Sequence, residues 1–304
     1  MKKFIGEGAL VLTTLLWGVT FVVIKLALTD VSPLLFVSIR FSIAALILLP
    51  FMFGILKLST KEAIIGGVIL GLLNFAGFAT QTVGLNFTSA TKSGFITGTF
   101  VVFTPILQFI IEKRVPRKEN VFGIILVLLG LILLSSKGTS IFDIFSELGE
   151  NFNIGDFFTL MCAIAFATYI VYLDMISHKI DYKLLVFIQL AVTGVAGWIF
   201  TLFLSASGLE KFSFSLNGTV IFSVIYTALL ATLLATTLQT KYQKSVTPTK
   251  AAIIFSLEPI FAAFFAFIII GEKVSSFGFI GGIFIFTGLL VSELMGKKEN
   301  KNNG

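Results

Sequence analysis

The chain has 304 residues, of which 56% are hydrophobic and 12% are charged, and its mean hydropathy is +1.01. So few polar residues cannot cover a water-facing globule of this size, which excludes a soluble protein and predicts an integral membrane protein. One cysteine, Cys162, excludes an internal disulfide, and with the one histidine, His178, it supplies too few ligands for a metal site, so we expect no metal and no cofactor. Membrane topology and anionic lipid explain the net charge of +6, which gives no reason to expect nucleic acid as a partner.

Apolar runs of membrane-spanning length follow one another along the chain. The first, after Lys2 and Lys3, is longer than the apolar core of a signal peptide and lacks a small-residue cleavage site, so it is interpreted as a span. The ten predicted spans are residues 8–28, 33–53, 62–84, 92–111, 120–135, 155–174, 184–205, 217–239, 250–270 and 276–294. The predicted fold is therefore an all-α polytopic membrane protein with ten transmembrane helices in a lipid bilayer.

The second half of the chain repeats the first. Positions matched at a separation of 149 residues are Glu7 with Asp156, Trp17 with Phe166 and Thr20 with Tyr169. Further along, a polar turn, an apolar helix with a proline, a charged corner and paired glycines recur after about 160 residues. Because each half has five spans, an odd number, the second half enters the membrane in the opposite sense, and the two halves are predicted to be inverted repeats.

The distribution of basic residues predicts the orientation. With the amino terminus in the cytoplasm, the inner segments hold sixteen Lys and Arg residues and the outer segments hold five. The positive-inside rule therefore predicts a multi-pass protein of the cell membrane, plasma or inner, with both termini cytoplasmic. The predicted domains are residues 1–137 and 154–294, with an extracytoplasmic linker at 138–153 and a cytoplasmic tail at 295–304. In the loop of about residues 136–154, acidic and apolar residues have the spacing of a short amphipathic helix on the membrane surface. Such a helix would be either a passive linker or a substrate gate.

Polar and aromatic residues recur at helical spacing within several spans. Inverted repeats can open a midplane site to one side and then to the other, so these stripes predict a central cavity that binds a small molecule. The residues expected to bind substrate are Trp17, Thr20, Asn74, Gln81, Thr97, Phe100, Phe166, Tyr169, Thr236 and Glu258. The alternative interpretation is that the polar members only hydrogen-bond between helices.

Two ionisable residues lie deep within the predicted spans. At roughly 1.5 Å per residue, Arg40 is about 10 Å and Glu258 about 12 Å from the nearer end of its span. A charge at the bilayer centre costs at least ~2.5 kcal/mol, so it is normally paired, facing water or functional. Glu258 is the candidate for binding a substrate amine or a coupling proton, or else it caps backbone broken beside Pro259. Arg40 is expected to brace carbonyls, and Pro105 and Pro259 to interrupt the fourth and ninth helices as structural or gating elements.

Glycines recur seven residues apart near the end of each half. They are Gly123 and Gly130 in the first half and Gly281 and Gly288 in the second. Residues without side chains allow helices to approach closely, so these positions predict a tight contact either within the bundle or in a homodimer.

A series of landmarks runs through about residues 5–294. They are Leu16-Trp17-Gly18, Phe21, Lys25, Pro33, Arg40, Gln81, Gly84-Leu85, Thr88-Ser89-Ala90, Gly94-Phe95, Pro105, Ser256-Leu257-Glu258-Pro259 and Gly271-Glu272-Lys273. With ten spans and two repeats, this series resembles the EamA-type exporters of the drug/metabolite transporter superfamily. The resemblance implies two EamA domains, a central cavity between them, and efflux of amino acids or other small metabolites, driven by an ion gradient or by the substrate's own gradient. Phe166 stands where such exporters often have Trp.

Several functions are compatible with these features, and export of small metabolites by alternating access is favoured. Exchange of sugars, nucleotide sugars or phosphate esters would require several intramembrane Lys or Arg, and only Arg40 is deep. Organic cations are a further substrate class because aromatic rings accompany one buried acid. A channel-like facilitator is the alternative from another class. We expect no enzyme, since the sequence has no Cys-His pair, Gly-x-Ser-x-Gly turn or carboxylate pair along one helix.

Overall fold

The computed structural model describes residues 2–56, 59–135, 152–210, 212–273 and 275–302. Regular structure in these residues is helical, apart from an isolated antiparallel bridge between Val31 and Phe214. Eight helical stretches among them are long and apolar enough to cross a membrane, and Ser276–Ser292 is a shorter apolar stretch. With Lys118–Ser135 these make ten helical segments where the sequence predicts ten spans, so the all-α polytopic fold is confirmed.

The helices follow the expected order, and three spans are built from more than one helix. The elements are α1 (Lys2–Ala27), α2 (Pro33–Leu56), α3 (Lys61–Phe87), α4 (Ala90–Gly98), α5 (Phe100–Glu112), α6 (Lys118–Ser135), α8 (Ile154–Ser177), α9 (Tyr182–Ala206), α10 (Gly218–Tyr226), the π-helix η1 (Thr227–Leu234), α11 (Ala235–Tyr242), the 3-10 turn η2 (Gln243–Ser245), α12 (Pro248–Phe255), α13 (Glu258–Ile270) and α14 (Ser276–Asn302). The fourth span is thus α4 with α5, the eighth is α10, η1 and α11, and the ninth is α12 with α13.

Polar caps fix equivalent helix starts in the two halves. Ser89 caps α4 and Thr247 caps α12, and each side-chain oxygen accepts a hydrogen bond from the N–H three residues further on, at Lys92 and Lys250. Such a cap satisfies a donor that the first helical turn leaves free. Ser89 and Thr247 are 158 residues apart (247 − 89), so the repeat in this region is 158 residues rather than about 160.

The fourth and ninth spans break at positions 158 residues apart. The tight hydrogen bonds at the breaks run from Thr99 N to Ile96 O and Val102 N to Thr99 O, and from Leu257 N to Ile254 O and Ile260 N to Leu257 O. Each joins residues three apart, the 3-10 pattern, which interrupts the regular α-helical bonding. The two halves therefore have the same backbone irregularity at equivalent positions.

The two prolines are not equivalent. Pro259 lies in the first turn of α13, where a missing N–H breaks no helical hydrogen bond. Pro105 lies inside α5, which continues through it, and the break is at Thr99 instead. The expected interruption at Pro105 is therefore wrong in position. A proline ring clashes with the carbonyl four residues before it, so the distortion falls on the preceding turn rather than on the proline.

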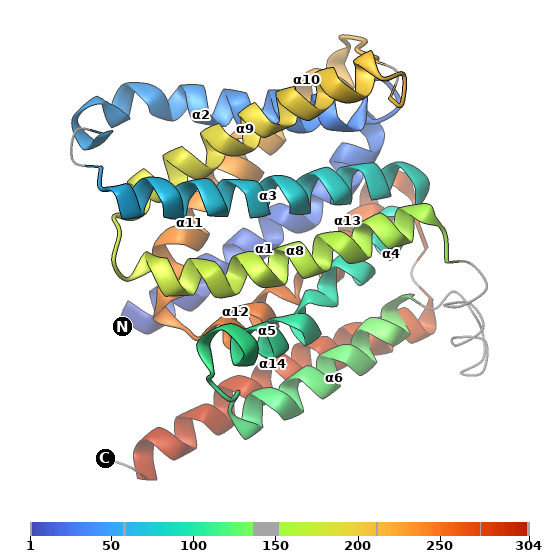
Figure 1. Cartoon of the computed structure of the whole chain (residues 1–304). Coiled ribbons are helices and arrows are strands. Elements are labelled where there is room, and N and C mark those ends of the chain that lie inside the picture. Colours follow the sequence, from blue (N-terminus) through green and yellow to red (C-terminus); the bar gives the residue numbers. More distant parts are fainter. Residues whose placement is uncertain (1, 57–58, 136–151, 211, 274, 303–304) are drawn as a thin grey trace.

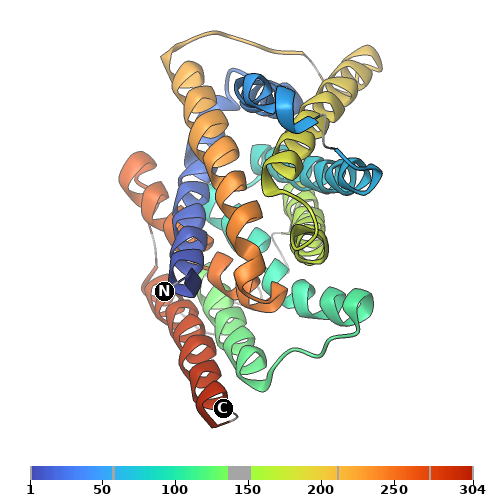
Figure 2. The same ribbon diagram turned by 90° about the vertical axis from the view of Figure 1, so that its left-hand side faces the viewer.

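Two pairs of long helices, each joining the two halves, lie at opposite edges of the bundle. Figures 1 and 2 show α6 and α14 side by side at one edge and α2 with α9 at the opposite edge. In Figure 1, α1 begins at the left-hand end, beside the amino terminus, whereas α8 begins at the right-hand end. The first helices of the two halves therefore run in opposite directions, as inverted repeats require.

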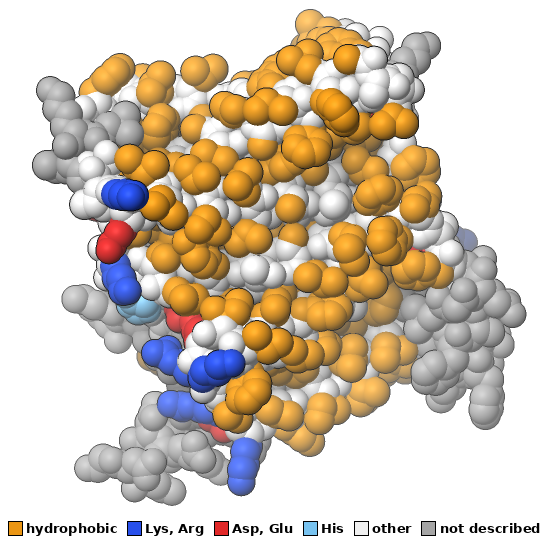
Figure 3. Space-filling view, in the orientation of Figure 1, with side chains coloured by type: hydrophobic (Ala, Val, Ile, Leu, Met, Phe, Trp, Pro, Cys, Tyr) orange, Lys and Arg blue, Asp and Glu red, His pale blue; other side chains and the backbone are white. Residues whose placement is uncertain are grey.

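The surface in Figure 3 is that of a membrane-spanning bundle. Hydrophobic side chains cover the length of the helices, and Lys and Arg gather at the left-hand end. The loops at that end, residues 113–117 and 178–181, contain Lys113, Arg114, Arg117 and Lys179. An apolar band with basic residues at one end is the pattern that the bilayer and its charged faces impose.

The paired glycines form the contact between α6 and α14. A Cβ at Gly130 would lie 2.6 Å from the carbonyl oxygen of Gly281, and one at Gly288 would lie 2.7 Å from that of Gly123. Such distances leave no room for a side chain, so the backbones touch directly within this chain. The surface helix predicted over about residues 136–154 lies outside the described residues, except for residues 152–154.

Candidate functional site

A cavity lies between the halves and is lined by side chains from both. Its lining residues are Trp17, Thr20, Asn74, Phe78, Gln81, Phe100, Phe166, Tyr169, Ile170, Gln239, Phe255 and Glu258. The cavity among them has a volume of about 20 Å³. That is room for about one water molecule, so the cavity is constricted in this conformation.

Residues at equivalent positions of the two halves face each other across this cavity. The pairs that line it are Trp17 with Phe166, Thr20 with Tyr169, Gln81 with Gln239, and Phe100 with Glu258. The first two pairs are 149 residues apart and the last two are 158 apart. Duplication has therefore placed the site between the repeats, where each half supplies a corresponding share of the wall.

Glu258 is the acidic residue of the cavity. It is the first residue of α13, immediately after the break in the ninth span, and it is 6% exposed. Within the described residues its carboxylate has no hydrogen-bond or ion-pair partner. The amino-terminal end of α13 favours negative charge there, and burial away from water leaves the carboxylate in need of a partner. Such a group can bind a cation, a protonated amine or a proton.

Trp17 is held at the cavity wall by an irregularity in the eighth span. In a regular α-helix the N–H of Ala235 would bond to the carbonyl of Ala231, but here it bonds to Leu230 and Thr232. The freed carbonyl of Ala231 accepts a hydrogen bond of 2.9 Å from Trp17 Nε1. Because the π-helix supplies this acceptor, the indole is fixed with one face available to the cavity.

The opposite wall is also aromatic. A Cβ at Gly77 would lie 2.9 Å from Cζ of Phe166, so the glycine makes room for this ring against α3. Phe166 in turn meets Phe78 edge to face, with their ring centroids 5.0 Å apart. Tyr169 is oriented by a 2.7 Å hydrogen bond from its hydroxyl to Gln189 Oε1. These rings form a rigid, mostly apolar surface.

Polar side chains complete the lining and leave some hydrogen-bonding capacity unused. Gln81 Nε2 donates to Thr97 Oγ1 at 3.3 Å. Asn74 is 3% exposed, and its Nδ2 has no partner among the described residues. Thr97 and Thr236 are buried but do not line the cavity, so eight of the ten residues expected to bind substrate lie on its wall and these two lie behind it. Asn74 and Glu258 line the same cavity, and a donor and an acid without partners in the described part of the chain suit a solute that has both acceptor and donor groups.

Arg40 is fully buried on α2 and does not line the cavity. Its Nε donates to Thr232 Oγ1 at 2.9 Å, and its guanidinium carbon lies 4.7 Å from the ring centroid of Phe78 and 5.1 Å from that of Phe41. Its two terminal nitrogens have no hydrogen-bond partner in the described residues. Arg40 therefore binds one hydroxyl and two ring faces rather than the expected carbonyls. It supports Phe78 from behind the cavity.

Comparison with known proteins places this architecture in a family. The EamA-like transporter family matches residues 4–136 and 153–294. The chain belongs to this family. An uncharacterized transporter of Archaeoglobus fulgidus is 33% identical over 294 residues, covering 97% of this chain and 87% of that protein. A second one from the same organism is 28% identical over 291 residues, covering 93% and 95%.

The fold is also similar to one that has been determined experimentally. A protein of solved crystal structure superposes with a TM-score of 0.73 at 14% identity, covering 95% of this chain and 96% of its own. At that identity the likeness establishes the fold alone. The family and the apolar helices together identify a multi-pass membrane transporter of the EamA family. Among the described residues, no group of three His, Cys, Asp or Glu side chains could hold a metal ion.

Four residues of the EamA cavity are not among the ten expected to bind substrate: Phe78, Ile170, Gln239 and Phe255. Gln239 follows Thr232 and Thr236 at helical spacing, so a signal for it was present. Phe255 is at the position equivalent to Thr97, 158 residues later, and the exact repeat would have indicated it. Phe78 and Ile170 are apolar residues in apolar helices, and their sequence context does not distinguish them from lipid-facing neighbours.

Proposed function

We propose that this EamA transporter exports small amphipathic metabolites, with amino acids and related amines as the substrate class, through the cavity between its halves. The observation that carries the proposal is the buried Glu258 carboxylate, which has no partner among the described residues, on an otherwise mostly aromatic and amide-lined wall. A protonated amine would bind Glu258, and the apolar part of the solute would lie against Trp17 and Phe166.

Alternating access is the mechanism that the geometry supports. The cavity has room for about one water molecule, so a solute can enter only if the halves move apart on one side. The tight turns at Thr99 and Leu257 give each half one point at which a helix can bend near the midplane. Inverted repeats can exchange their conformations, which would open the site first to one side and then to the other. Glu258 would then be occupied by substrate in one state and by a proton or another cation in the other.

Organic cations are the second candidate, because the same wall favours them. The ring centroids of Trp17 and Phe255 are 5.4 Å apart, and both rings line the cavity together with Glu258. Aromatic faces beside an acid bind quaternary ammonium groups through cation–π attraction. Phosphate esters are disfavoured, since the cavity lining contains neither Lys nor Arg in the described part of the chain.

The test is counterflow in proteoliposomes that contain the purified chain. Labelled amino acids, sugars, phosphate esters and organic cations would be supplied outside vesicles loaded with the same unlabelled compound, with and without an imposed proton gradient. We expect saturable counterflow of amino acids or related amines, with accumulation that responds to the gradient.

The other results would each exclude a part of the proposal. Counterflow of organic cations alone would replace the substrate class. Flux that does not saturate would indicate a channel-like facilitator. Folded protein that moves none of the four classes would contradict the exporter hypothesis.

A further inference from the structure

Two ion pairs connect one half of the molecule to the other, away from the cavity. Lys92 Nζ lies 2.6 Å from Asp156 Oδ2, and Lys250 Nζ lies 2.6 Å from Glu7 Oε1. Lys92 and Glu7 belong to the first half, whereas Asp156 and Lys250 belong to the second. Each bond therefore has to break if the halves are to separate at that point.

The internal repeat relates these two ion pairs to each other. Glu7 and Asp156 are 149 residues apart, the separation that matches the first helices of the two halves. Lys92 and Lys250 are 158 residues apart, the separation of the helix caps and of the breaks. In each pair, the acid near the start of the first helix of one half binds a lysine in the first turn of the broken helix of the other half.

The backbone packing beside the two pairs is repeated as well. A Cβ on Gly155, next to Asp156, would lie 2.6 Å from the carbonyl oxygen of Gly84 and 2.7 Å from the Cβ of Phe87. A Cβ on Gly6, next to Glu7, would lie 3.7 Å from the carbonyl oxygen of Tyr242 and 3.2 Å from the Cβ of Ser245. Tyr242 and Ser245 are 158 residues after Gly84 and Phe87, so both pairs occupy the same local structure.

The pairs lie at opposite ends of the bundle. Glu7 is near the amino terminus at the left-hand end in Figure 1, and Asp156 is at the start of α8 at the right-hand end. Both lysines lie at the edge of the protein, with side chains that are 22% exposed at Lys92 and 13% exposed at Lys250. Water can therefore solvate each lysine when its bond opens, which lowers the cost of separation compared with a pair at the bilayer centre.

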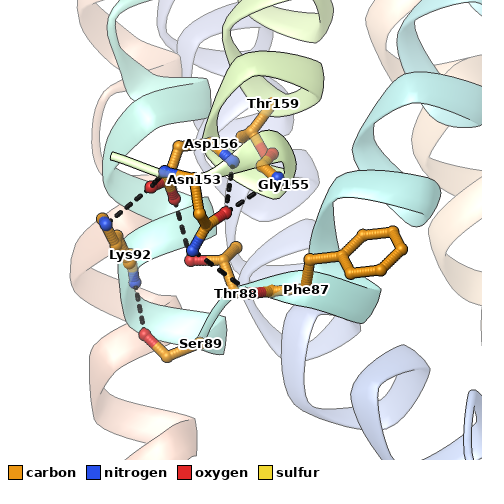
Figure 4. Close-up of polar contacts among 8 residues, drawn as sticks. All are labelled: Phe87, Thr88, Ser89, Lys92, Asn153, Gly155, Asp156 and Thr159. Atoms are coloured by element: carbon orange, nitrogen blue, oxygen red, sulfur yellow. Dashed lines mark hydrogen bonds and ion pairs between the residues drawn. The ribbon is translucent and has the colours of Figure 1, made fainter. Parts of the chain in front are cut away.

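The pair at the right-hand end has additional support, as Figure 4 shows. Asp156 also accepts hydrogen bonds of 2.9 Å from Thr88 Oγ1 and from the N–H of Asn153. Lys25 Nζ donates at 2.7 Å to the carbonyls of Leu85 and Thr88, which ties α1 to the same turn. At the other end, the position equivalent to Thr88 is Val246, which has no hydroxyl. Asp156 is therefore bonded to the turn before α4 and to the start of its own helix as well as to Lys92.

We propose that Glu7–Lys250 and Lys92–Asp156 are the two gates of the transporter, both closed in this structure and opening one at a time. The proposal rests on alternating access as the proposed function, and it assigns the closing contacts to four named side chains. A closed gate at each end accounts for a cavity with room for about one water molecule.

The test measures opening directly and needs no substrate. A cysteine placed in the cavity by Thr20→Cys, in a Cys162→Ala background, reacts with a membrane-impermeant trimethylammonium methanethiosulfonate only when a path to it is open. The reagent would be applied to each face of oriented vesicles in turn. One variant neutralises the first gate (Glu7→Gln with Lys250→Met) and another removes the second (Lys92→Met), which leaves Asp156 to cap its own helix.

The expected result is specific to one face. Loss of a charge-assisted bond shifts a two-state equilibrium by about tenfold, so each variant should raise the labelling rate about tenfold from the face on which its gate lies. Labelling from the opposite face should not rise. The matched control exchanges the charges, with Glu7→Lys and Lys250→Glu, and should return the rate to that of the parent.

Three results would overturn the proposal. Unchanged labelling in variants that elute as folded monodisperse protein would show that the pairs do not control access. An equal rise from both faces would indicate general loosening instead of gating. A charge exchange that fails to restore the parent rate, although the protein is folded, would show that the residues do not act as a pair. Because none of these readouts depends on transport, a wrong substrate class would leave them interpretable.

Discussion

The two helix breaks share one backbone geometry, but different residues follow them. Phe100 begins α5 and Glu258 begins α13, 158 residues apart, and both side chains line the cavity. Elsewhere on the wall, equivalent positions keep a similar character, as in Trp17 with Phe166 or Gln81 with Gln239. Duplication therefore explains the shape of the site, and the exchange of an apolar ring for an acid at this position gives the wall its negative charge. The acid, not the break, is what distinguishes the second half.

The largest expected effect comes from removing that difference. Glu258→Gln should reduce counterflow by roughly 10- to 100-fold, because a charge-assisted bond to substrate or coupling ion is lost. The matched control is Phe100→Leu at the equivalent position, which should reduce transport only about threefold because it changes packing alone. Both rates are to be normalised to folded protein in the membrane. A Glu258→Gln variant that loses folded protein and transport in equal measure would assign Glu258 to folding instead.

The close contact between the last helices of the two halves offers a comparison of stability. In Gly281→Ala the new Cβ would lie 2.6 Å from the backbone nitrogen of Leu134, so the variant should lose about 1–3 kcal/mol of stability through overpacking. Gly282→Ala is the matched control, since nothing lies within 4 Å of the added Cβ. Thermal unfolding in detergent measures both. Equal melting temperatures would show that α6 and α14 do not pack as described.

The aromatic walls of the two halves differ by one hydrogen bond. Trp17 is anchored to Ala231, whereas its counterpart Phe166 has no polar atom to anchor. Trp17→Ala should therefore change relative rates across a substrate panel by about five- to tenfold, because a contact surface and its anchor are both lost. Trp17→Phe, which keeps a ring and loses only the anchor, should have the smaller effect. An unchanged profile in Trp17→Ala would remove α1 from the binding wall.

The smallest effect is expected at the loop between α9 and α10, outside the spans. Partial burial raises the pKa of Glu210 above its ordinary value, although the N–H of Leu34 at 3.4 Å from Oε1 opposes the shift. The folded state therefore binds the proton more tightly, and stability falls as pH rises from the unfolded pKa through the folded one. Glu210→Gln should raise the free energy of unfolding at about pH 8 by less than about 1 kcal/mol, because the group is partly exposed, and should leave it unchanged at about pH 4. Melting temperatures at the two pH values measure this. A stabilisation that is the same at both pH values would contradict this.

Much of the fold could be predicted from the sequence because the membrane restricts it. The ten apolar runs predict membrane-spanning helices, and the paired glycines predict a close helix contact. The structure has both where the sequence predicts them. The sequence predicts the break of the fourth span at Pro105, whereas the structure has it at Thr99. The sequence shows the proline but not which preceding turn is distorted by its ring. The match between Phe100 and Glu258 requires the separation of 158 residues, and the repeat predicted from the sequence has only the value of about 160.

The candidate site was predictable where polarity stands out against apolar helices. Asn74, Gln81 and Glu258 were identified in this way, and all three line the cavity. Thr97 shares a helix face with such residues, but Gln81 hydrogen-bonds to it from the cavity side. Phe78 could not be identified, because a phenylalanine facing lipid and one facing the cavity have similar neighbours in sequence. Only the packing of α3 against α2 and α8 separates them.

The π-helix in the eighth span also accommodates a difference in length between this span and its counterpart in the first half, the third span. Thr60 and Asn217, which cap α3 and α10, are 157 residues apart, whereas Ser89 and Thr247, which cap the next spans, are 158 apart. The eighth span thus has one more residue than its counterpart, and the wide turn of η1 holds it. In a regular helix that residue would rotate everything beyond it by about 100° and turn lipid-facing side chains inward. A one-residue insertion or deletion after duplication was thereby tolerated, and the carbonyl it exposed now anchors Trp17.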